Sequence, residues 1–318
     1  MKKGYRYGTA ARTAITAFLC LAFSTLQGNG AGIVPPGTSR LADNGTASNP
    51  ARWWFNGDYT SPTGAVFEIG VRVSGNANYN YLTVSNGQTF IASAGLWVGR
   101  NNTYHNLLDV REGALVEVHG DAHCGEGSIM YYSKYNRINV SGASARFLVT
   151  DNLILSSGFN GTDNYLSLSD GGIAVVDSDK DGTGSFYLYN HWAYGNCWLE
   201  LNGGALLLYG DKTADFASGK GILSSIKVWD PVSNSLERVA YYDNQVLKET
   251  PSKQFLEVAY LQTAADAADR GLGSEYAGYT IVRNIPEPGT LGLMLPAAGG
   301  ILWWRLRKER RRGFRRRR

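Results

Sequence analysis

The sequence predicts an all-β protein whose body is a solenoid of short, stacked strands. Five stretches of the chain repeat one pattern of alternating apolar residues, and a glycine follows each of them. The composition agrees, because 39 glycines and 19 tyrosines in 318 residues favour strands and tight turns over helices. A strand-rich body of this length can form a single domain, so we expect one.

Each repeat begins with a polar residue and continues with two apolar residues separated by one position. A period of two predicts a strand with one buried face. The following glycine marks a corner, where the backbone needs positive φ or a close approach. The repeats begin at Asn80, Asn106, Asn136, Asn164 and Cys197, with apolar pairs Leu82 and Val84, Leu108 and Val110, Ile138 and Val140, Leu166 and Leu168, and Leu199 and Leu201, and corner glycines Gly87, Gly113, Gly142, Gly171 and Gly204.

A repeat that buries one face cannot fold alone, so we expect neighbouring repeats to stack into a solenoid. The repeat starts lie 26 to 33 residues apart, and apolar runs at Leu96 and Leu153 indicate a third strand in each coil. The first apolar residue of every repeat should lie in one buried column, with steps of ~4.8 Å. A sandwich or jelly roll of short strands is the competing arrangement.

The pattern resembles the glycine-rich repeats of parallel β-helices in autotransporter-like and PEP-CTERM proteins. The resemblance covers residues 80–209 and implies a right-handed parallel β-helix. Such a helix needs a cap at each end. We assign residues 32–79 to an N-terminal cap, 80–220 to the repeats and 221–284 to a C-terminal cap, in which residues 256–271 should form a helix that stops at Gly271.

The N-terminus has the three parts of a secretory signal peptide. Basic residues precede an apolar run from Ala14 to Leu26, and small residues follow it. The run of 13 residues is shorter than the ~20 that a membrane-spanning helix needs. We therefore assign residues 1–31 to a signal peptide and predict that the chain is exported.

The C-terminal residues 285–318 also have three parts. A Pro-Glu-Pro triplet is followed by the uncharged residues 290–304, and residues 305–318 contain ten Lys or Arg. The uncharged stretch is short for a hydrocarbon core of ~30 Å, but Trp303 and Trp304 suit a membrane interface. The basic run lies on one side only, which places it in the cytoplasm and the body outside. We predict a single transmembrane helix at residues 290–304.

This order resembles the PEP-CTERM sorting domain, whose members are substrates of membrane-embedded exosortases. Pro286, Glu287 and Pro288 match the family's triplet, whereas Pro296 in the apolar stretch departs from a regular helix. The resemblance implies an exosortase as partner and cleavage near the triplet. It also implies a precursor anchored in the inner membrane, followed by release or transfer of the body to the cell surface or extracellular matrix.

The net charge of +4 arises at the ends of the chain, so the body is mildly acidic. A nucleic-acid partner is not expected, because the body lacks a basic surface. Cys20 lies in the signal peptide, which leaves Cys124 and Cys197 in an oxidising compartment. Cys197 begins a repeat, whereas Cys124 falls between two, so we expect the pair to be too far apart for a disulfide.

Two functions follow from these patterns. The first is a non-catalytic surface or matrix protein that is sorted by exosortase and associates with exopolysaccharide. The alternative is a secreted polysaccharide lyase or hydrolase on the same fold, but nucleophile-elbow and zinc-protease motifs are absent. The acids nearest the repeat strands occupy different repeat positions, which disfavours the alternative: Asp109, Glu117, Asp151, Asp170 and Glu200.

One acidic segment matches the start of a calcium-binding loop. Asp177, Asp179 and Asp181 stand at alternate positions before Gly182, but Leu188 occupies the position of the usual bidentate glutamate. These aspartates are therefore candidate ligands of a weak calcium site that other loop oxygens would complete, with a solvated turn as the alternative, and no other cofactor is expected. The segment 119–126 offers two histidines and Cys124, which would suit zinc or copper, although we prefer to interpret it as a polar loop between coils.

Aromatic residues are dense at residues 186–198. Alternation along a strand directs Phe186 and Leu188 inward. Tyr187, Tyr189 and Trp192 are then the outward candidates for binding carbohydrate, since the apolar faces of sugar rings stack on aromatic rings.

Overall fold

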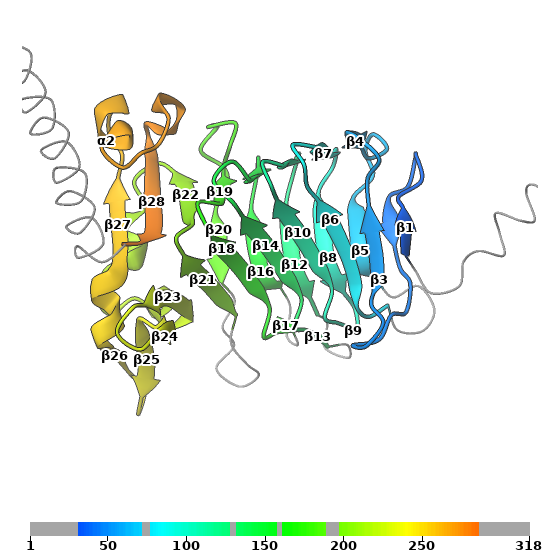
Figure 1. Ribbon diagram of the computed structural model, residues 1–318. Helices are drawn as coiled ribbons and strands as arrows, with labels where there is room; N and C mark the ends of the chain where they lie inside the picture. The colour runs from blue at the N-terminus through cyan, green and yellow to red at the C-terminus, as the bar shows by residue number, and fades with distance from the viewer. Residues whose placement is uncertain (1–30, 72–76, 128–131, 158–160, 189–196, 286–318) are drawn as a thin grey trace, which may run out of the picture.

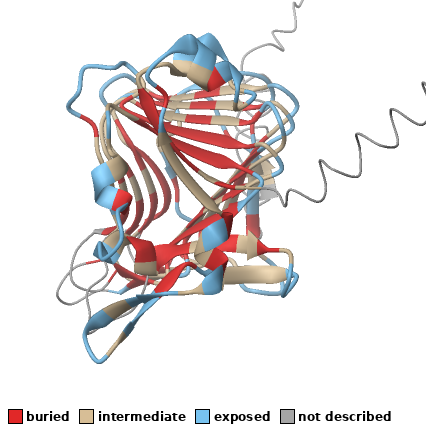
Figure 2. Ribbon diagram, turned by 90° about the vertical axis from the view of Figure 1, so that its left-hand side faces the viewer, coloured by how far each residue is buried: buried red, intermediate tan, exposed pale blue. Residues whose placement is uncertain are grey.

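The computed structural model describes residues 31–71, 77–127, 132–157, 161–188 and 197–285. The body is a β-solenoid of about six coils, in which the chain passes in turn through three sheets (Figure 1). Buried residues line the inside of the coil, and exposed residues gather in the loops and at the C-terminal end (Figure 2). The predicted signal peptide, apart from Ala31, and the predicted sorting tail with its transmembrane helix, apart from Ile285, lie outside the described residues. Among the described helices, none is long and apolar enough to cross a bilayer.

The three sheets are numbered in the order in which each full coil passes through them, as from β6 through β7 to β8. The first sheet contains β1 (Ala31–Ile33), β3 (Ala51–Trp54), β6 (Asn80–Val84), β10 (Leu107–Arg111), β14 (Arg137–Ser141), β18 (Tyr165–Ser169), β21 (Trp198–Asn202), β23 (Ile226–Asp230) and β24 (Ser235–Arg238). The second contains β4 (Tyr59–Thr60), β7 (Thr89–Ala92), β11 (Leu115–Val118), β15 (Arg146–Val149), β19 (Ile173–Val176), β22 (Ala205–Tyr209), β28 (Tyr279–Asn284) and β27 (Leu256–Tyr260). The third contains β2 (Arg40–Leu41), β5 (Phe67–Val71), β8 (Leu96–Arg100), β12 (Ala122–Glu126), β16 (Leu153–Ser157) and β20 (Phe186–Leu188). A small sheet joins β9 (Thr103–Tyr104), β13 (Ser133–Lys134) and β17 (Gly161–Thr162), where the third sheet leads back to the first.

The predicted buried column is confirmed. Successive coils pair in parallel, with Leu108 opposite both Leu82 and Ile138, and with Leu166 opposite both Ile138 and Leu199. All five side chains are fully buried. The apolar pattern set this register, because a slip by one residue would turn the whole apolar set toward water. These coils are therefore stacked in parallel, and the competing antiparallel arrangement is excluded for them.

The predicted corner glycines are confirmed as well. Four of them have φ between 71° and 99°, which other residues adopt only with strain. At the fifth, Gly204, a side chain would meet the backbone carbon of Leu168 at 2.5 Å. Each glycine thus permits the bend from the first sheet to the second.

The asparagines that begin the repeats form a continuous internal column. Asn80, Asn106, Asn136 and Asn164 are fully buried. The Oδ1 atoms of Asn106, Asn136 and Asn164 each accept two bonds from the preceding asparagine, one from its backbone N–H and one from its side-chain amide, at 2.9 to 3.1 Å. At the last step Asn164 donates to Ser156 Oγ at 2.6 Å and to the Ser133 carbonyl. Because an amide both donates and accepts, the column satisfies itself from coil to coil.

A glycine in the third sheet makes room for each asparagine. A side chain on Gly70, Gly99 or Gly125 would lie 2.0 to 2.2 Å from the nearest side-chain atom of Asn106, Asn136 or Asn164 respectively, and all three glycines have positive φ. The next equivalent position is Ser156, also at positive φ and fully buried, where Cys197 takes the place of the next asparagine while the serine hydroxyl also accepts from Asn164. Cys197 is smaller than an asparagine and leaves space for the Ser156 hydroxyl. The larger residue in the third sheet therefore accompanies the smaller residue in the column.

Neither Cys124 nor Cys197 is in a disulfide, as predicted, and both are buried. Cys124 points into the core from β12, where its Sγ lies 3.6 Å from the Tyr165 carbonyl. Cys197 continues the asparagine column, since the next residue, Trp198, pairs with Tyr165. Burial raises the pKa of the Cys197 thiol to about 11, and burial also raises that of Cys124.

The outer side of the same corner carries stacked rings. Tyr79, His105 and Tyr135 each precede a column asparagine and adopt φ near 57°. The His105 ring lies between the two tyrosines, with centroid distances of 4.7 and 4.9 Å and interplanar angles of 7° and 14°. Burial lowers the pKa of His105. The stack is thus an aromatic counterpart, on the outside, of the amide column inside.

The solenoid begins before residue 80, where the repeats were expected to start. Strands β3, β4 and β5 lie in the predicted N-terminal cap, yet they pair in parallel with β6, β7 and β8. They form a full coil that the repeat pattern does not reveal, because Ala51 stands opposite Asn80 and Trp53 stands opposite Leu82. Strands β1 and β2 lie beyond this coil and cover its outer edge.

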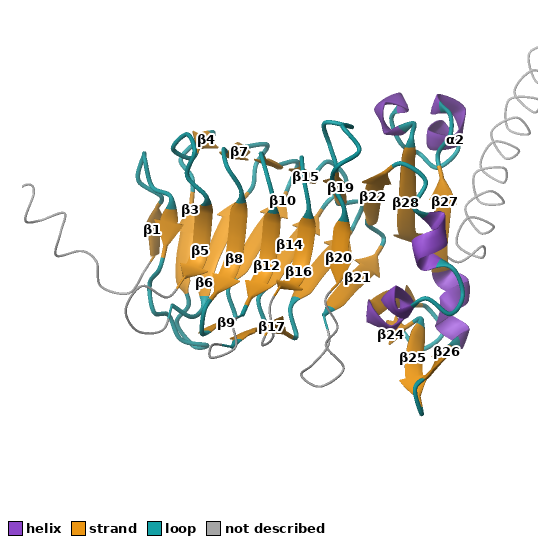
Figure 3. Ribbon diagram, turned by 180° about the vertical axis from the view of Figure 1, so that it is seen from behind, coloured by secondary structure: helices purple, strands orange, loops and turns teal. Residues whose placement is uncertain are grey.

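The C-terminal segment closes the other end of the solenoid (Figure 3). The expected helix at residues 256–271 is wrong for its first part, because β27 pairs antiparallel with β28, which itself pairs antiparallel with β22. Only Ala264–Ala268 (α2) is helical; Thr263 caps it and Gly271 ends the turn at φ 72°. A long-range pairing has overridden local helix preference in this segment. A hairpin of β25 (Ala240–Asp243) and β26 (Val246–Glu249) and four 3₁₀ helices complete the cap: η1 (Thr213–Phe216), η2 (Gly221–Ser225), η3 (Pro251–Phe255) and η4 (Ser274–Tyr276).

Candidate functional site

The three aspartates of the predicted calcium loop lie together. They occupy the corner between β19 and β20, where the second sheet leads to the third. One carboxylate oxygen from each of Asp177, Asp179 and Asp181 lies within 4.8 Å of the others, and no other such group of His, Cys, Asp or Glu occurs among the described residues. The calcium site remains a prediction, but its three residues have the proximity that it requires.

Asp177 differs from the other two because it is 1% exposed. Its Oδ1 accepts a bond from the Gly182 N–H at 3.3 Å, whereas its Oδ2 has no hydrogen-bond partner in the described part of the chain. Burial raises the pKa of this carboxyl, against the N–H groups of Gly182 and Gly184, which lower it. Asp181 is exposed, and its Oδ1 accepts from both the N–H and the hydroxyl of Thr183, which lowers its pKa.

Two further acids from earlier coils stand at the same corner. Burial, and then the charges of Asp121 and of the three loop aspartates, raise the pKa of Asp151. Asp121 accepts two bonds from Asn152, one from the backbone and one from the amide, at 2.9 and 3.0 Å. Asn152 Oδ1 in turn accepts from the Ser185 N–H at 3.0 Å. The sequence alone does not link Asp151 to the loop aspartates. The link is visible only when the corner of the preceding coil, which carries Asp151, is aligned with the corner that carries the loop.

The segment of residues 177–182, called the aspartate loop below, also contacts the C-terminal cap. The Tyr279 hydroxyl of β28 donates to the Asp177 carbonyl at 3.2 Å, in a buried bond. The Lys180 ammonium donates to the Glu275 carbonyl of η4 at 2.7 Å and lies 5.3 Å from the centre of the Tyr279 ring. The loop's one lysine is therefore engaged with the cap.

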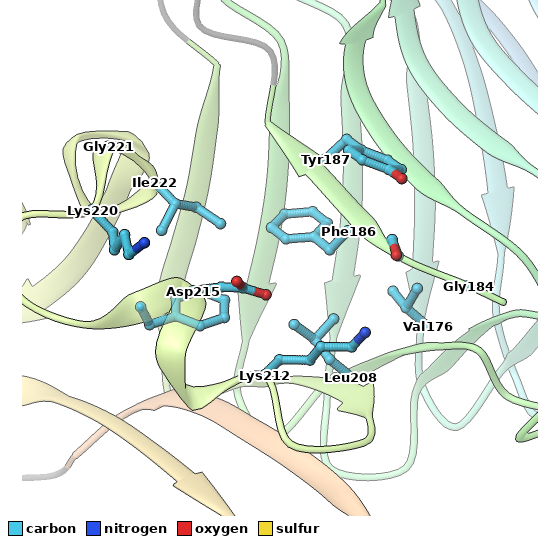
Figure 4. A pocket seen from close by; sticks show the side chains of 12 residues that line it. Val176, Gly184, Phe186, Tyr187, Leu208, Lys212, Asp215, Lys220, Gly221 and Ile222 are labelled. Atoms are coloured by element: carbon cyan, nitrogen blue, oxygen red, sulfur yellow. The ribbon is translucent and has the colours of Figure 1, made fainter. Parts of the chain in front are cut away.

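A pocket of about 380 Å³ opens on the other side of this corner (Figure 4). It arises because the third sheet ends at β20 while the other two sheets continue, and η1 and η2 lie beside the end of β20. Its walls combine apolar and charged side chains, and the Tyr187 ring stands at one side (Figure 4). The lining includes Phe186, Tyr187, Leu208, Lys212, Asp215 and Lys220. The two lysines and Asp215 were not among the predicted site residues, because no repeat or motif in the surrounding sequence indicates a site.

Tyr187 points outward, as predicted, with 42% of its surface exposed, while Phe186 and Leu188 pack against the core. Tyr189 and Trp192, the other candidates for carbohydrate binding, lie outside the described residues. The register places Tyr187 at the end of an outward column on the third sheet. The column runs through Glu68, Trp97, His123, Ile154 and Tyr187.

The segment 119–126 is not a loop along its whole length, because Ala122–Glu126 forms β12. His123 faces outward beside Trp97, whereas Cys124 faces the core. His119 lies 3.7 Å from Glu117. Alternation along the strand thus separates the thiol from the imidazoles, and these residues do not form a metal-binding group.

The acids considered for catalysis are mostly held by other side chains. Glu200 accepts from Arg137 at 2.6 Å and from Lys227 at 3.1 Å. Asp109 accepts from the Asn139 amide at 2.7 Å. The expectation that the acids occupy different repeat positions is wrong for Asp109 and Glu200, which share one outward column of the first sheet because each follows the first residue of its repeat by three positions; Asn139 and Ser167 stand between them. Among the five, the structure therefore brings only Asp151 into an acidic cluster.

No protein-family model, curated protein or solved structure matches the chain. The function must therefore be inferred from the residues of the chain and their arrangement.

Proposed function

We propose that the chain is an exported, non-catalytic surface or matrix protein that an exosortase sorts. The observation that carries this proposal is the C-terminal order of Pro286–Glu287–Pro288, an uncharged stretch and a basic run. The body is compatible with such a role, since a capped solenoid presents long, regular faces. The expected hand of its coils is right-handed, as in nearly all parallel crossovers.

Sorting is tested by changing the tail in cells that contain an exosortase. Glu287→Gln should block processing and leave the chain in the membrane fraction, whereas removal of residues 285–318 should release unprocessed protein into the medium. Glu309→Gln, in the basic run of the same tail, is the matched control and should be processed as wild type. Envelope retention of the truncated chain would contradict the proposal.

We further propose that the body associates with extracellular polysaccharide through the third sheet and the pocket at its end. Tyr187 offers a partly exposed ring, and Lys212, Lys220 and Asp215 offer charged groups around the same pocket. Sugar rings stack on such aromatic faces, and lysines bind their acidic substituents.

Tyr187→Ala should weaken binding of the full chain to the host's purified exopolysaccharide about tenfold, which corresponds to about 1.4 kcal/mol. Tyr241→Ala is the control, because Tyr241 is equally exposed at 42% but lies on the cap hairpin. Equal loss in both variants would contradict this assignment. Shortening of the polysaccharide during incubation would instead favour the alternative function, a lyase or hydrolase.

A further inference from the structure

The aspartate loop, residues 177–182, combines two independent features that point to a bound ion. The first is the proximity of three carboxylates, whose oxygens lie within 4.8 Å of one another. Carboxylates this close repel each other unless a positive charge lies between them. The loop's own lysine, Lys180, donates to the Glu275 carbonyl of the cap instead.

The second feature is the buried oxygen of Asp177. Exposed acids need no partner other than water, but Asp177 is 1% exposed and its Oδ2 lacks a donor among the described residues. A buried carboxylate oxygen without a partner is costly and calls for an explanation, such as an ion. The same carboxylate supplies one of the three grouped oxygens, so the unpartnered oxygen belongs to a ligand of the candidate site.

The ligand set defines the class of ion. Its atoms are carboxylate oxygens, without a nitrogen or sulfur donor, which suits hard divalent cations rather than zinc or copper. Two oxygens on opposite sides of Ca²⁺ lie about 4.6 to 5.2 Å apart, and on opposite sides of Mg²⁺ only about 4.0 to 4.2 Å. Separations below 4.8 Å allow all three oxygens to contact one ion. A set of three carboxylates on a loop is typical of Ca²⁺, whereas Mg²⁺ keeps several waters and is usually bound through only one or two carboxylates.

We propose that residues 177–182 bind a divalent cation, Ca²⁺ in preference to Mg²⁺, and that the ion fixes the C-terminal cap to the solenoid. The coupling follows from the bonds of the same loop. The Asp177 carbonyl accepts from Tyr279 of β28, and the Lys180 ammonium donates to η4. An ion that orders the loop orders both contacts. This inference does not depend on the sorting or polysaccharide proposals.

Binding is tested by titrating the full chain, purified in mild detergent, with Ca²⁺ alone and with Mg²⁺ alone. Three carboxylates without the usual bidentate glutamate predict weak binding, with a Kd of about 0.1 to 1 mM for Ca²⁺. Calorimetry measures the affinity, and thermal unfolding should show a rise in Tm of a few degrees, about 2 to 5 °C, at saturating Ca²⁺. Asp179→Asn and Asp181→Asn, both at exposed positions, should weaken Ca²⁺ binding about tenfold.

The matched control is Asp211→Asn. Asp211 is exposed, and its Oδ1 accepts from the N–H and hydroxyl of Thr213, as Asp181 does from Thr183. It belongs to no group of three acids. Wild-type response to Ca²⁺ in this variant, with loss of response in the other two, supports the site. An equal response in all variants, or none in wild type, overturns it.

Coupling to the cap has its own readout. Hydrogen exchange should slow on Ca²⁺ addition at residues 274–284 as well as at residues 177–183. Lys180→Ala should retain Ca²⁺ binding but reduce the slowing at residues 274–276, since that variant removes the bond to Glu275. Exchange in the cap that stays unchanged while Ca²⁺ binds would overturn the coupling.

Discussion

Two corners of the solenoid bring polar side chains together. The two corners differ in how the hydrogen-bonding groups of those side chains are satisfied. At the corner between the third and first sheets, four buried asparagines bond to one another. At the corner between the second and third sheets, three aspartates gather, and one buried oxygen has no hydrogen-bond partner in the part of the chain that the structure describes. An amide donates and accepts, whereas a carboxylate only accepts. The first corner is therefore complete within the protein, and the second calls for an additional positive species.

The largest effect is expected when an asparagine of the first corner becomes an acid. Asn136→Asp keeps the shape but removes the donor to Asn164 and to Ser133, and it buries a charge. We expect a loss of about 3 to 5 kcal/mol in the free energy of unfolding at pH 7. The new carboxyl would have a raised pKa, so the loss should shrink as the pH falls. Chemical denaturation measures it, and Asn86→Asp, at an exposed turn, should change stability by less than about 0.5 kcal/mol.

A second test replaces one pair of residues at the asparagine column, Gly125 and Asn164, with the serine and cysteine that form the pair at its end. Gly125→Ser alone should cost about 3 kcal/mol, because its Cβ would lie 2.0 Å from the Asn164 amide at φ 83°. Adding Asn164→Cys recreates the natural pairing of Ser156 with Cys197 and should recover about 1 to 2 kcal/mol. Purely additive losses in a double-mutant cycle would contradict the pairing.

The converse change makes the acidic corner resemble the first one. Asp177→Asn supplies an amide donor at the buried position and removes one negative charge, so we expect the ion-free protein to gain about 1 kcal/mol. The same variant should lose the stabilisation by Ca²⁺. Thermal unfolding with and without Ca²⁺ measures both, and a variant that stays responsive to Ca²⁺ would show that Asp177 is not a ligand.

A smaller effect is expected on the outer side of the first corner. Because burial lowers the pKa of His105, the unfolded state binds its proton more readily, and stability falls as the pH drops through about 6.5. His105→Tyr keeps the stack, since tyrosines hold the equivalent positions, and removes this contribution. The variant should lose less Tm than wild type between pH 7 and pH 5, by on the order of 1 °C. Identical pH profiles would mean that the stack does not perturb the imidazole.

The smallest effect is expected from reduction. Cys124 and Cys197 are buried and not in a disulfide, so a reducing agent should leave Tm unchanged. Both thiols should react with a thiol reagent only as fast as the body unfolds. Rapid titration of either thiol in the native state would contradict the burial described above.

The repeat pattern was sufficient to predict the buried column and the corner glycines, because these features follow from residue spacing within one coil. It could not predict features that depend on contacts between distant segments. The coil at β3 to β5 lacks the asparagine and leucine that mark the others. Strand β27 forms because β28 lies beside it, although its sequence favours a helix locally.

The candidate site was predicted in part for the same reason. The spacing of Asp177, Asp179 and Asp181 is local, so the sequence reveals it. The burial of Asp177 depends on the surrounding fold, its contact with Tyr279 depends on a strand 102 residues away, and the pocket beside Tyr187 depends on where the third sheet ends. Each of these requires the fold before it can be recognised.

The asparagine column also makes the reach of the body adjustable in whole steps. Residues 106–135 carry an asparagine that bonds to the coils on either side and a glycine, Gly125, that accommodates an asparagine further on. A tandem copy of these residues would find every partner it needs, and each copy would extend the body by ~4.8 Å. Unequal duplication within a gene could therefore change how far this protein extends without creating a new fold.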